Sequence, residues 1–224
     1  MGSDTQLSEE YSSKLVEYYQ QPRNELLDYI NEDVKVVLDV GCAGGSFGKF
    51  LKAERNCVVW GIEPSEAMSK EAAKHLDVVI NDIFSEDLAE LDGQLFDVIC
   101  FNDVLEHMVN PNAALKVAKR FLSKNGYILA SIPNILYFPV VSDLVFKQDW
   151  KYAEYGVLDN THLRFYTKKS MVRMFEECGF EVARIEGINP LVSRKYSLAN
   201  LLSLNFLYDW RFVQFVVIAK PQNT

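Results

Sequence analysis

Three glycines and an acid near the start of the chain have the types and spacing of a nucleotide-binding corner. Residues 36–40 predict a buried parallel strand, and Gly41, Gly44 and Gly45 then allow a sharp turn that comes close to a ligand. Apolar residues beyond the turn recur at helical spacing, so a helix should begin there with its free N–H groups facing the ligand. Asp39 would repel a pyrophosphate, but it suits an ammonium or sulfonium charge. A nucleoside joined to a methionine therefore fits better than a dinucleotide.

A second acid stands at the end of the next predicted strand, residues 57–62. Glu63 lies 22 residues beyond Gly41 and is followed by Pro64. An acid at about this distance, at a strand end, commonly accepts hydrogen bonds from ribose hydroxyls. We therefore predict that Glu63 binds the ribose of the same ligand.

Polar residues also follow the third and fourth predicted strands. Residues 77–80 lead into Asn81 and Asp82, and residues 96–101 lead into Asn102. Open α/β sheets bind ligands at the carboxyl ends of their strands. These side chains are therefore expected at the ligand, with Asn81 and Asp82 placed to read an adenine edge.

Four ordered segments, LDVGCAGG, GIEPS, NDI and FDVICFNDVLEHM, together resemble the class I S-adenosylmethionine-dependent methyltransferases. The resemblance is strong over roughly residues 34–133 and looser to the end, and it implies S-adenosylmethionine as the cofactor. The family usually has glycine where Ala43 stands, and a backbone with negative φ would tolerate the change. The expected cofactor-binding residues are Asp39, Gly41, Ala43, Gly45, Glu63, Pro64, Asp82, Ile83 and Asn102.

Each of these residues also has a purely structural interpretation when it is taken alone. Asp39 could cap the N-terminus of a helix, and Glu63 could cap a helix that begins at Pro64. Taken together, the ordered set favours ligand binding over helix capping.

The expected fold is α/β: a Rossmann-like, doubly wound, seven-stranded sheet, mostly parallel with an antiparallel last strand and helices on both faces. Residues 1–33 are predicted to form a helical lid, interrupted at Pro22. Residues 34–224 are predicted to form the S-adenosylmethionine-binding domain. Insertions at 134–166 and 189–209 are left to build the acceptor side.

Composition limits the class of protein. The 224 residues are 49% hydrophobic, enough for a full core, and no segment is long and apolar enough to span a membrane. The sequence has no recognisable signal peptide, and its four scattered cysteines have the pattern of buried thiols in a reduced, cytoplasmic protein. We expect a monomer or a homodimer.

Charge is divided unevenly along the chain. Residues 1–112 contain 8 basic and 22 acidic residues, whereas residues 113–224 contain 15 and 9. The net charge of −8 argues against nucleic acid as a partner. The basic excess is either a solvated surface or a site for an anionic acceptor, to which Arg164 and Lys168 would contribute.

The acceptor is expected to be a small or carrier-linked hydroxyl compound. The insertion at 134–166 is rich in aromatic residues that suit a sugar ring or another flat acceptor. The segments SIPN (131–134) and DNTHLRFYTKKSM (159–171) resemble methyltransferases of glycan and ubiquinone-type pathways. A glycan-type sugar is therefore predicted first and a phenol second. His107 and His162 are the candidate catalytic bases, since an imidazole exchanges its proton near neutral pH.

Three further interpretations remain open at this point. Asp103, Glu106 and His107 would share one helical face and could hold a divalent ion, as a similar run in ubiquinone-pathway O-methyltransferases implies. The main expectation is nevertheless a site without metal. An NAD-dependent Rossmann oxidoreductase and a non-catalytic S-adenosylmethionine-binding module are the alternatives to a methyltransferase.

Overall fold

The computed structural model describes residues 23–222, and the chain divides into two compact units. Unit 1 comprises Met1–Cys100 and Phe121–Ser123, and unit 2 comprises Phe101–Arg120 and Lys124–Thr224. Of the predicted lid at 1–33, residues 1–22 lie outside the described residues. The short 3-10 helix η1 (Asn24–Tyr29) forms in the remainder.

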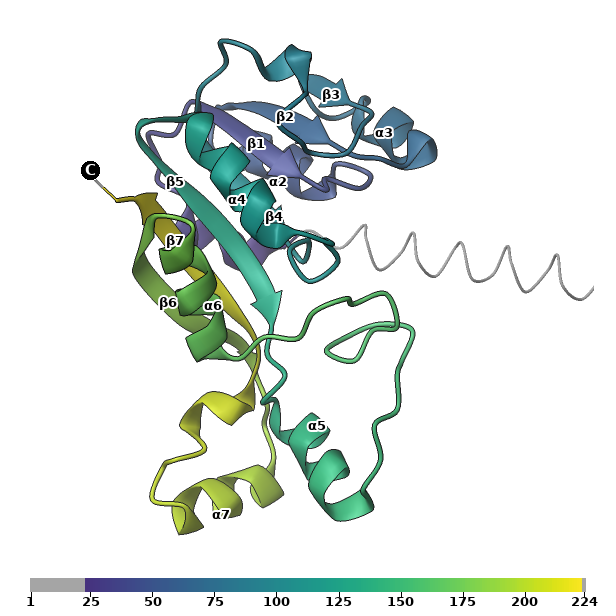
Figure 1. Ribbon diagram of the computed structural model, residues 1–224, viewed down its shortest axis with the longest axis vertical. Coiled ribbons are helices and arrows are strands. Elements are labelled where there is room, and N and C mark those ends of the chain that lie inside the picture. Colours follow the sequence, from purple (N-terminus) through teal and green to yellow (C-terminus); the bar gives the residue numbers. More distant parts are fainter. Residues whose placement is uncertain (1–22, 223–224) are drawn as a thin grey trace, which may run out of the picture. The chain divides into compact units, whose positions relative to one another are not determined.

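Within the described part of the chain, seven strands form one mixed sheet in the order β3-β2-β1-β4-β5-β7-β6 (Figure 1). The pairs β1–β2 and β2–β3 are parallel, whereas β7 runs antiparallel to both β5 and β6. The predicted fold class is therefore confirmed. The strands are β1 (Val36–Val40), β2 (Val58–Ile62), β3 (Val78–Ile80), β4 (Phe96–Asn102), β5 (Leu122–Pro133), β6 (Phe180–Pro190) and β7 (Phe212–Pro221).

Unit 1 contains the first three strands, the helices that connect them and residues 96–100 of β4. Helix α2 (Ser46–Glu54) joins β1 to β2, and α3 (Glu66–Ala72) joins β2 to β3. A Cβ on Gly48 would lie 2.9 Å from a methyl of Val59 and closer still to one of Leu76. Glycine at this position therefore lets α2 pack closely against β2. The short 3-10 helix η2 (Ala89–Leu91) precedes β4.

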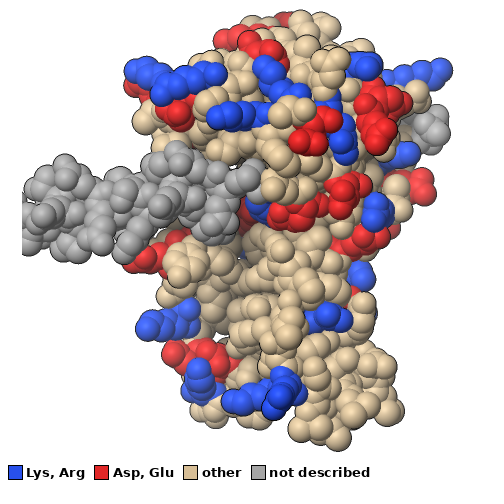
Figure 2. Space-filling view, turned by 180° about the vertical axis from the view of Figure 1, so that it is seen from behind, with Lys and Arg blue, Asp and Glu red and all other residues tan. Residues whose placement is uncertain are grey.

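Unit 2 contains two longer helices and two additions. Helices α4 (Pro111–Arg120) and α6 (Lys168–Glu177) are amphipathic, and Thr167 and Ser170 form a capping box at the start of α6. The first addition holds α5 (Phe138–Ser142) and the π-helix η3 (Asp143–Lys147), and the second holds α7 (Arg194–Leu202) and the 3-10 helix η4 (Tyr208–Arg211). At the lower right of Figure 2, where α7 lies, the surface is largely uncharged.

The buried amide of Asn134 fastens the first addition to the second. Its Nδ2 donates to the carbonyl oxygens of Asp209 and Phe212, at 3.1 and 2.9 Å. The ring of Phe138 packs edge-on against that of Tyr196, with centroids 5.5 Å apart. The two additions, far apart in sequence, thus form one packed region of unit 2.

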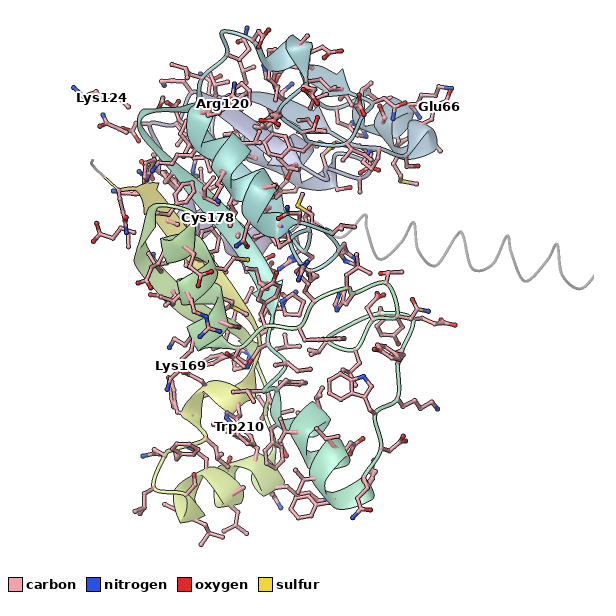
Figure 3. All side chains as sticks on the ribbon, in the orientation of Figure 1. Glu66, Arg120, Lys124, Lys169, Cys178 and Trp210 are labelled. Carbon is pink, nitrogen blue, oxygen red and sulfur yellow. The ribbon has the colours of Figure 1, made fainter. Side chains whose placement is uncertain are left out.

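All four cysteines are buried and free, as the sequence predicts. Burial raises the pKa of the Cys42 and Cys100 thiols, which keeps both in the neutral form. Cys178 ends helix α6, and its Sγ lies 3.6 Å from the carbonyl oxygen of Asn112 (Figure 3). No helix within residues 23–222 is long and apolar enough to cross a membrane.

Candidate functional site

The loop between β1 and α2 in unit 1 turns through three left-handed residues. Gly41, Ala43 and Gly45 have φ values of 71°, 45° and 78°. The N–H groups of Gly41 and Cys42 both donate to the carbonyl of Ile62, at 2.8 and 3.1 Å, so the loop is anchored to the end of β2. A Cβ on Gly45 would lie 3.0 Å from the backbone of the facing helix, so only glycine fits there without movement.

Ala43 differs from the expectation. A negative φ was expected to let alanine replace the usual glycine here, but the observed φ is 45°, in the left-handed region. An alanine in the left-handed region costs roughly 1–2 kcal/mol relative to a right-handed one. The N–H of Ala43 donates to Oε2 of Glu63 at 3.0 Å, and this charge-assisted bond offsets the strain.

Glu63 is buried at the end of β2, and it links the loop between β1 and α2 to the loop between β2 and α3. Its Oε2 accepts from Ala43, and its Oε1 accepts from the backbone N–H of Ser65 at 2.8 Å. Each oxygen keeps a further lone pair for a ligand hydroxyl. Ser65, not Glu63, is the N-cap of α3, and Asp39 lies inside β1, so both helix-cap interpretations were wrong.

Asp39 is an acid held ready for a positive charge. Its side chain is only 2% exposed, and burial, followed by the charge of Glu63, raises its pKa to about 7. Among residues 23–222, no group donates a hydrogen bond to this carboxyl, which contrasts with the two donors on Glu63. A bound cation is therefore the partner that would stabilise its ionised form.

Of the residues that follow β3, Asn81 supports a neighbouring loop, whereas Asp82 and Ile83 are exposed. Nδ2 of Asn81 donates to the carbonyls of Glu63 and Pro64, at 2.8 and 3.1 Å, so its amide nitrogen braces the neighbouring loop. The Asp82 carboxylate is exposed and accepts from the N–H of Ile83, whose side chain is also exposed. An acceptor next to an uncovered apolar side chain suits a purine, which has a polar edge and a flat apolar face.

Asn102 ends β4, on the unit 2 side of the division. Both Nδ2 and Oδ1 of its amide are buried, and neither has a hydrogen-bond partner among residues 23–222. A buried polar group left in this way costs about 1–3 kcal/mol. A ligand that pairs with the amide would recover this cost.

Unit 2 gathers Glu106, His107 and His162 into one cluster. One ligand atom from each lies within 4.8 Å of the other two. The two imidazole rings meet edge to face with centroids 4.7 Å apart, and Nε2 of His162 is 4.0 Å from Oε1 of Glu106. The carbonyl of Glu106 also accepts from the N–H groups of Leu163 and Arg164, which brings the two segments of chain together.

Hydrogen bonds to each Nδ1 fix the orientation of the two imidazoles. Nδ1 of His162 is 3.2 Å from the carbonyl of Val157, to which it must donate. Nδ1 of His107 is 3.1 Å from Oγ1 of Thr161, whose own hydroxyl donates to Asp159 at 2.6 Å. Thr161 therefore accepts from His107. In its neutral form, each ring would therefore carry its proton on Nδ1 and offer Nε2 as an acceptor.

The buried His162 is suited to take a proton. Burial, followed by the nearby His107, lowers the pKa of His162 below its usual value. The ring is therefore neutral at neutral pH, and its Nε2 lone pair can act as a base or as a metal ligand.

The residues that could hold a metal differ in one member from the set predicted from the sequence. Asp103 has a φ of 56°, and its Oδ1 accepts from Ser131 and Gln214 at 3.3 and 2.6 Å, whereas His162 joins Glu106 and His107. Metal-binding histidines usually donate the other ring N–H to a carbonyl or a polar side chain, as both do here. The three residues therefore fit a divalent ion. Sequence spacing missed His162, which lies 55 residues beyond His107.

Aromatic rings extend from the cluster into the first addition. Phe165 lies 6.2 Å from the His162 ring, and Trp150 and Tyr152 lie 5.3 and 6.4 Å from Phe165, all measured between centroids. Trp150 and Tyr152 are both partly exposed. These three rings, which we call the aromatic platform, lie next to the His162 imidazole.

Two basic residues expected to hold an anionic acceptor have structural partners instead. Arg164 donates to the carbonyl oxygens of Met108 and Val109. The Lys168 Nζ is 3.2 Å from Asp209 and lies over the ring of Phe215. Each side chain thus has partners within unit 2, which weakens the case that the two hold an anionic acceptor.

Comparison with known proteins adds independent findings. The family model described as a methyltransferase domain matches residues 11–185. A ubiquinone biosynthesis O-methyltransferase of Neisseria meningitidis serogroup A is 26% identical over 83% of this chain and 82% of its own length. The enzyme of the same name from Pseudomonas syringae pv. tomato is 30% identical over 77% and 76%. A SAM-dependent methyltransferase structure from Archaeoglobus fulgidus has a TM-score of 0.71 at 20% identity, and covers 94% of this chain and 99% of its own.

Proposed function

Because the chain belongs to the family of S-adenosylmethionine-dependent methyltransferases, we propose that it methylates a phenolic hydroxyl group, with His107 or His162 as the base. The observation that carries this proposal is the pair of imidazoles, each fixed through Nδ1 and adjoining the aromatic platform. Family membership excludes the NAD-dependent oxidoreductase and favours the enzyme over a binding module.

Unit 1 would bind the methyl donor. Glu63 would accept from the ribose hydroxyls, Asp82 and Ile83 would contact the adenine, and Asp39 would face positive charge on the methionine part. The left-handed Gly41 and Gly45 bring backbone close to the ligand. When bound, S-adenosylmethionine supplies a methyl group already activated by its sulfonium. The enzyme then has only to align the acceptor and remove its proton.

Unit 2 would bind and deprotonate the acceptor. A phenol has a pKa of about 10, so a neutral imidazole can accept its proton while the methyl group is transferred. The 4.0 Å separation between His162 and the Glu106 carboxylate favours the imidazolium that results. The proton thus moves from the acceptor oxygen to Nε2 of one of the two histidines.

A phenol is placed ahead of a sugar for two reasons. The aromatic platform suits a planar ring, with centroid spacings of the kind that stacked and edge-on rings adopt. The relatives that cover most of this chain are named as ubiquinone biosynthesis O-methyltransferases. A glycan-type sugar remains the second candidate, without the support once expected from Arg164 and Lys168.

A divalent ion is the second candidate for activating the hydroxyl. Glu106, His107 and His162 would hold it, and the ion would lower the pKa of a bound hydroxyl. In that case Nε2 of each histidine would be a ligand and not a base. The two possibilities predict opposite responses to chelators.

The four free, buried cysteines also support a reducing compartment, so we propose the cytoplasm as the location.

A screen of catechol-type phenols and sugar nucleotides for S-adenosylhomocysteine release tests the acceptor class. We expect turnover with a phenol, and loss of turnover in His107→Ala or His162→Ala with S-adenosylmethionine affinity unchanged. Turnover restricted to sugar nucleotides would reject the phenol. Abolition of activity by chelator and recovery with Mg²⁺ or Mn²⁺ would assign the cluster to a metal.

A further inference from the structure

The segment between β6 and β7, residues 191–208, exposes large apolar side chains. Val192, Leu204 and Phe206 are 94%, 91% and 81% exposed, and Leu201 and Leu202 are 69% and 76% exposed. Residues so exposed project from the surface instead of lying flat on it. Contiguous apolar surface of this kind marks an interaction site.

The inner side of the same segment is well packed, so the exposure does not come from an open fold. The buried Tyr196 packs on Phe138 of the first addition, and its hydroxyl lies 3.2 Å from the carbonyl oxygens of both Leu207 and Tyr208. Figure 1 shows α5 and α7 at the same end of unit 2. Residues 191–208 are therefore held to the rest of unit 2, while their large apolar side chains stay exposed.

Charge on this face has a single sign. At 100° per residue, Leu198, Leu201 and Leu202 of α7 share a side with Arg194 and Lys195. Both basic side chains are exposed, and neither forms an ion pair with any residue of the described part. Residues 191–208 contain no Asp or Glu, although the chain as a whole has a net charge of −8.

We propose that residues 191–208 dock the protein on a membrane surface that contains anionic lipids. Leu201, Leu204 and Phe206 would enter the boundary between headgroups and acyl chains, while Arg194 and Lys195 would pair with lipid phosphates. Projecting apolar residues next to unpaired cations are the combination that interfacial segments use. A second copy docked through the same face would instead bring the two basic pairs together without an acid to match them. This inference is independent of which hydroxyl is methylated.

The direct test is sedimentation of the full chain with vesicles. The protein should bind vesicles that contain phosphatidylglycerol, bind pure phosphatidylcholine vesicles much more weakly, and lose binding as salt is raised. Absence of binding to both kinds of vesicle would overturn the proposal. So would a dimer in sedimentation velocity that dissociates in Leu201→Asp, because the face would then belong to a second copy.

Two double variants separate the contributions. Leu201→Asp with Phe206→Asp should lower partition by roughly a hundredfold, since two large apolar side chains no longer leave water. Arg194→Glu with Lys195→Glu should lower it by roughly tenfold or more, and only on anionic vesicles. Leu95→Asp, at an exposed leucine of unit 1, is the matched control and should bind as wild type. Thermal melting checks that each variant folds, and equal binding by all three variants would reject residues 191–208 as the docking surface.

Discussion

The loop from Asp39 to Gly45 and the cluster of Glu106, His107 and His162 are built in different ways. The loop is continuous in sequence, and its shape comes from left-handed backbone conformations and bonds to the neighbouring strand end. The cluster joins residues 55 positions apart through side-chain contacts and two backbone bonds to Glu106. A local motif thus identifies the cofactor side, whereas the acceptor side becomes visible only after folding.

The largest expected effect tests the cluster. His162→Ala should lower kcat by about 10²–10⁴-fold, the usual contribution of a general base, and leave S-adenosylmethionine affinity unchanged. Steady-state kinetics and calorimetry measure the two quantities. His75→Ala, at a histidine of unit 1 outside the cluster, is the control. A drop in cofactor affinity equal to the drop in kcat would show that the cluster does not act separately from the cofactor loop.

The second prediction tests the loop. Asp39→Asn should weaken S-adenosylmethionine binding by roughly ten- to a hundredfold, since a charge-assisted contact is lost. The same variant should raise the melting temperature of the free protein at pH 8, because wild type must then bury an ionised carboxyl. Glu63→Gln should weaken binding too, but lower the melting temperature through its bonds to Ala43 and Ser65. A melting temperature that moves in the same direction in both variants would refute these different roles for the two acids.

The third prediction concerns pH. The pKa of Asp39 is about 7 in the free protein, and a bound cation would lower it, so binding releases a proton below pH 7. Affinity for S-adenosylmethionine should therefore rise up to about tenfold per pH unit as pH approaches 7, and level off above it. The stability of the ligand-free protein should change with pH in the opposite direction. The contribution of Asp39 to the free energy of unfolding is fully present below its unfolded pKa of 3.8, and it is lost as pH rises through 7. Calorimetry in two buffers of different ionisation enthalpy detects the proton, and a pH-independent affinity would remove Asp39 from the charge contact.

The smallest expected effect concerns backbone strain in the loop. Ala43→Gly should stabilise the protein by up to about 1 kcal/mol, because glycine has no penalty at a φ of 45°. Gly45→Ala should destabilise it by about 1–3 kcal/mol, since its φ is 78° and its Cβ would meet the facing backbone at 3.0 Å. Chemical denaturation measures both. Equal and small changes would mean that the loop is not held as tightly as its bonds indicate.

Much of unit 1 follows from the sequence alone. The strands, the glycine turn and the acid at the end of β2 are predictable because apolar runs and glycines act on the few residues next to them. Two local details were still not predictable. The φ of Ala43 depends on a bond to Glu63, which lies 20 residues away, and Asn81 braces the loop after β2.

The acceptor side was decided by the tertiary structure. The sequence named His107 and His162 as bases and grouped Glu106 with His107, but it did not predict that His162 joins them. It chose Asp103 as the third member, whereas the fold turns that acid toward Ser131 and Gln214. Arg164 was expected to hold an anionic acceptor, yet its Nε and Nη2 donate to the carbonyl oxygens of Met108 and Val109. Spacing along a chain fixes which side chains share a helix or strand, because backbone geometry repeats. Contacts between distant segments depend on packing, which has no such period, and only the folded chain determines them.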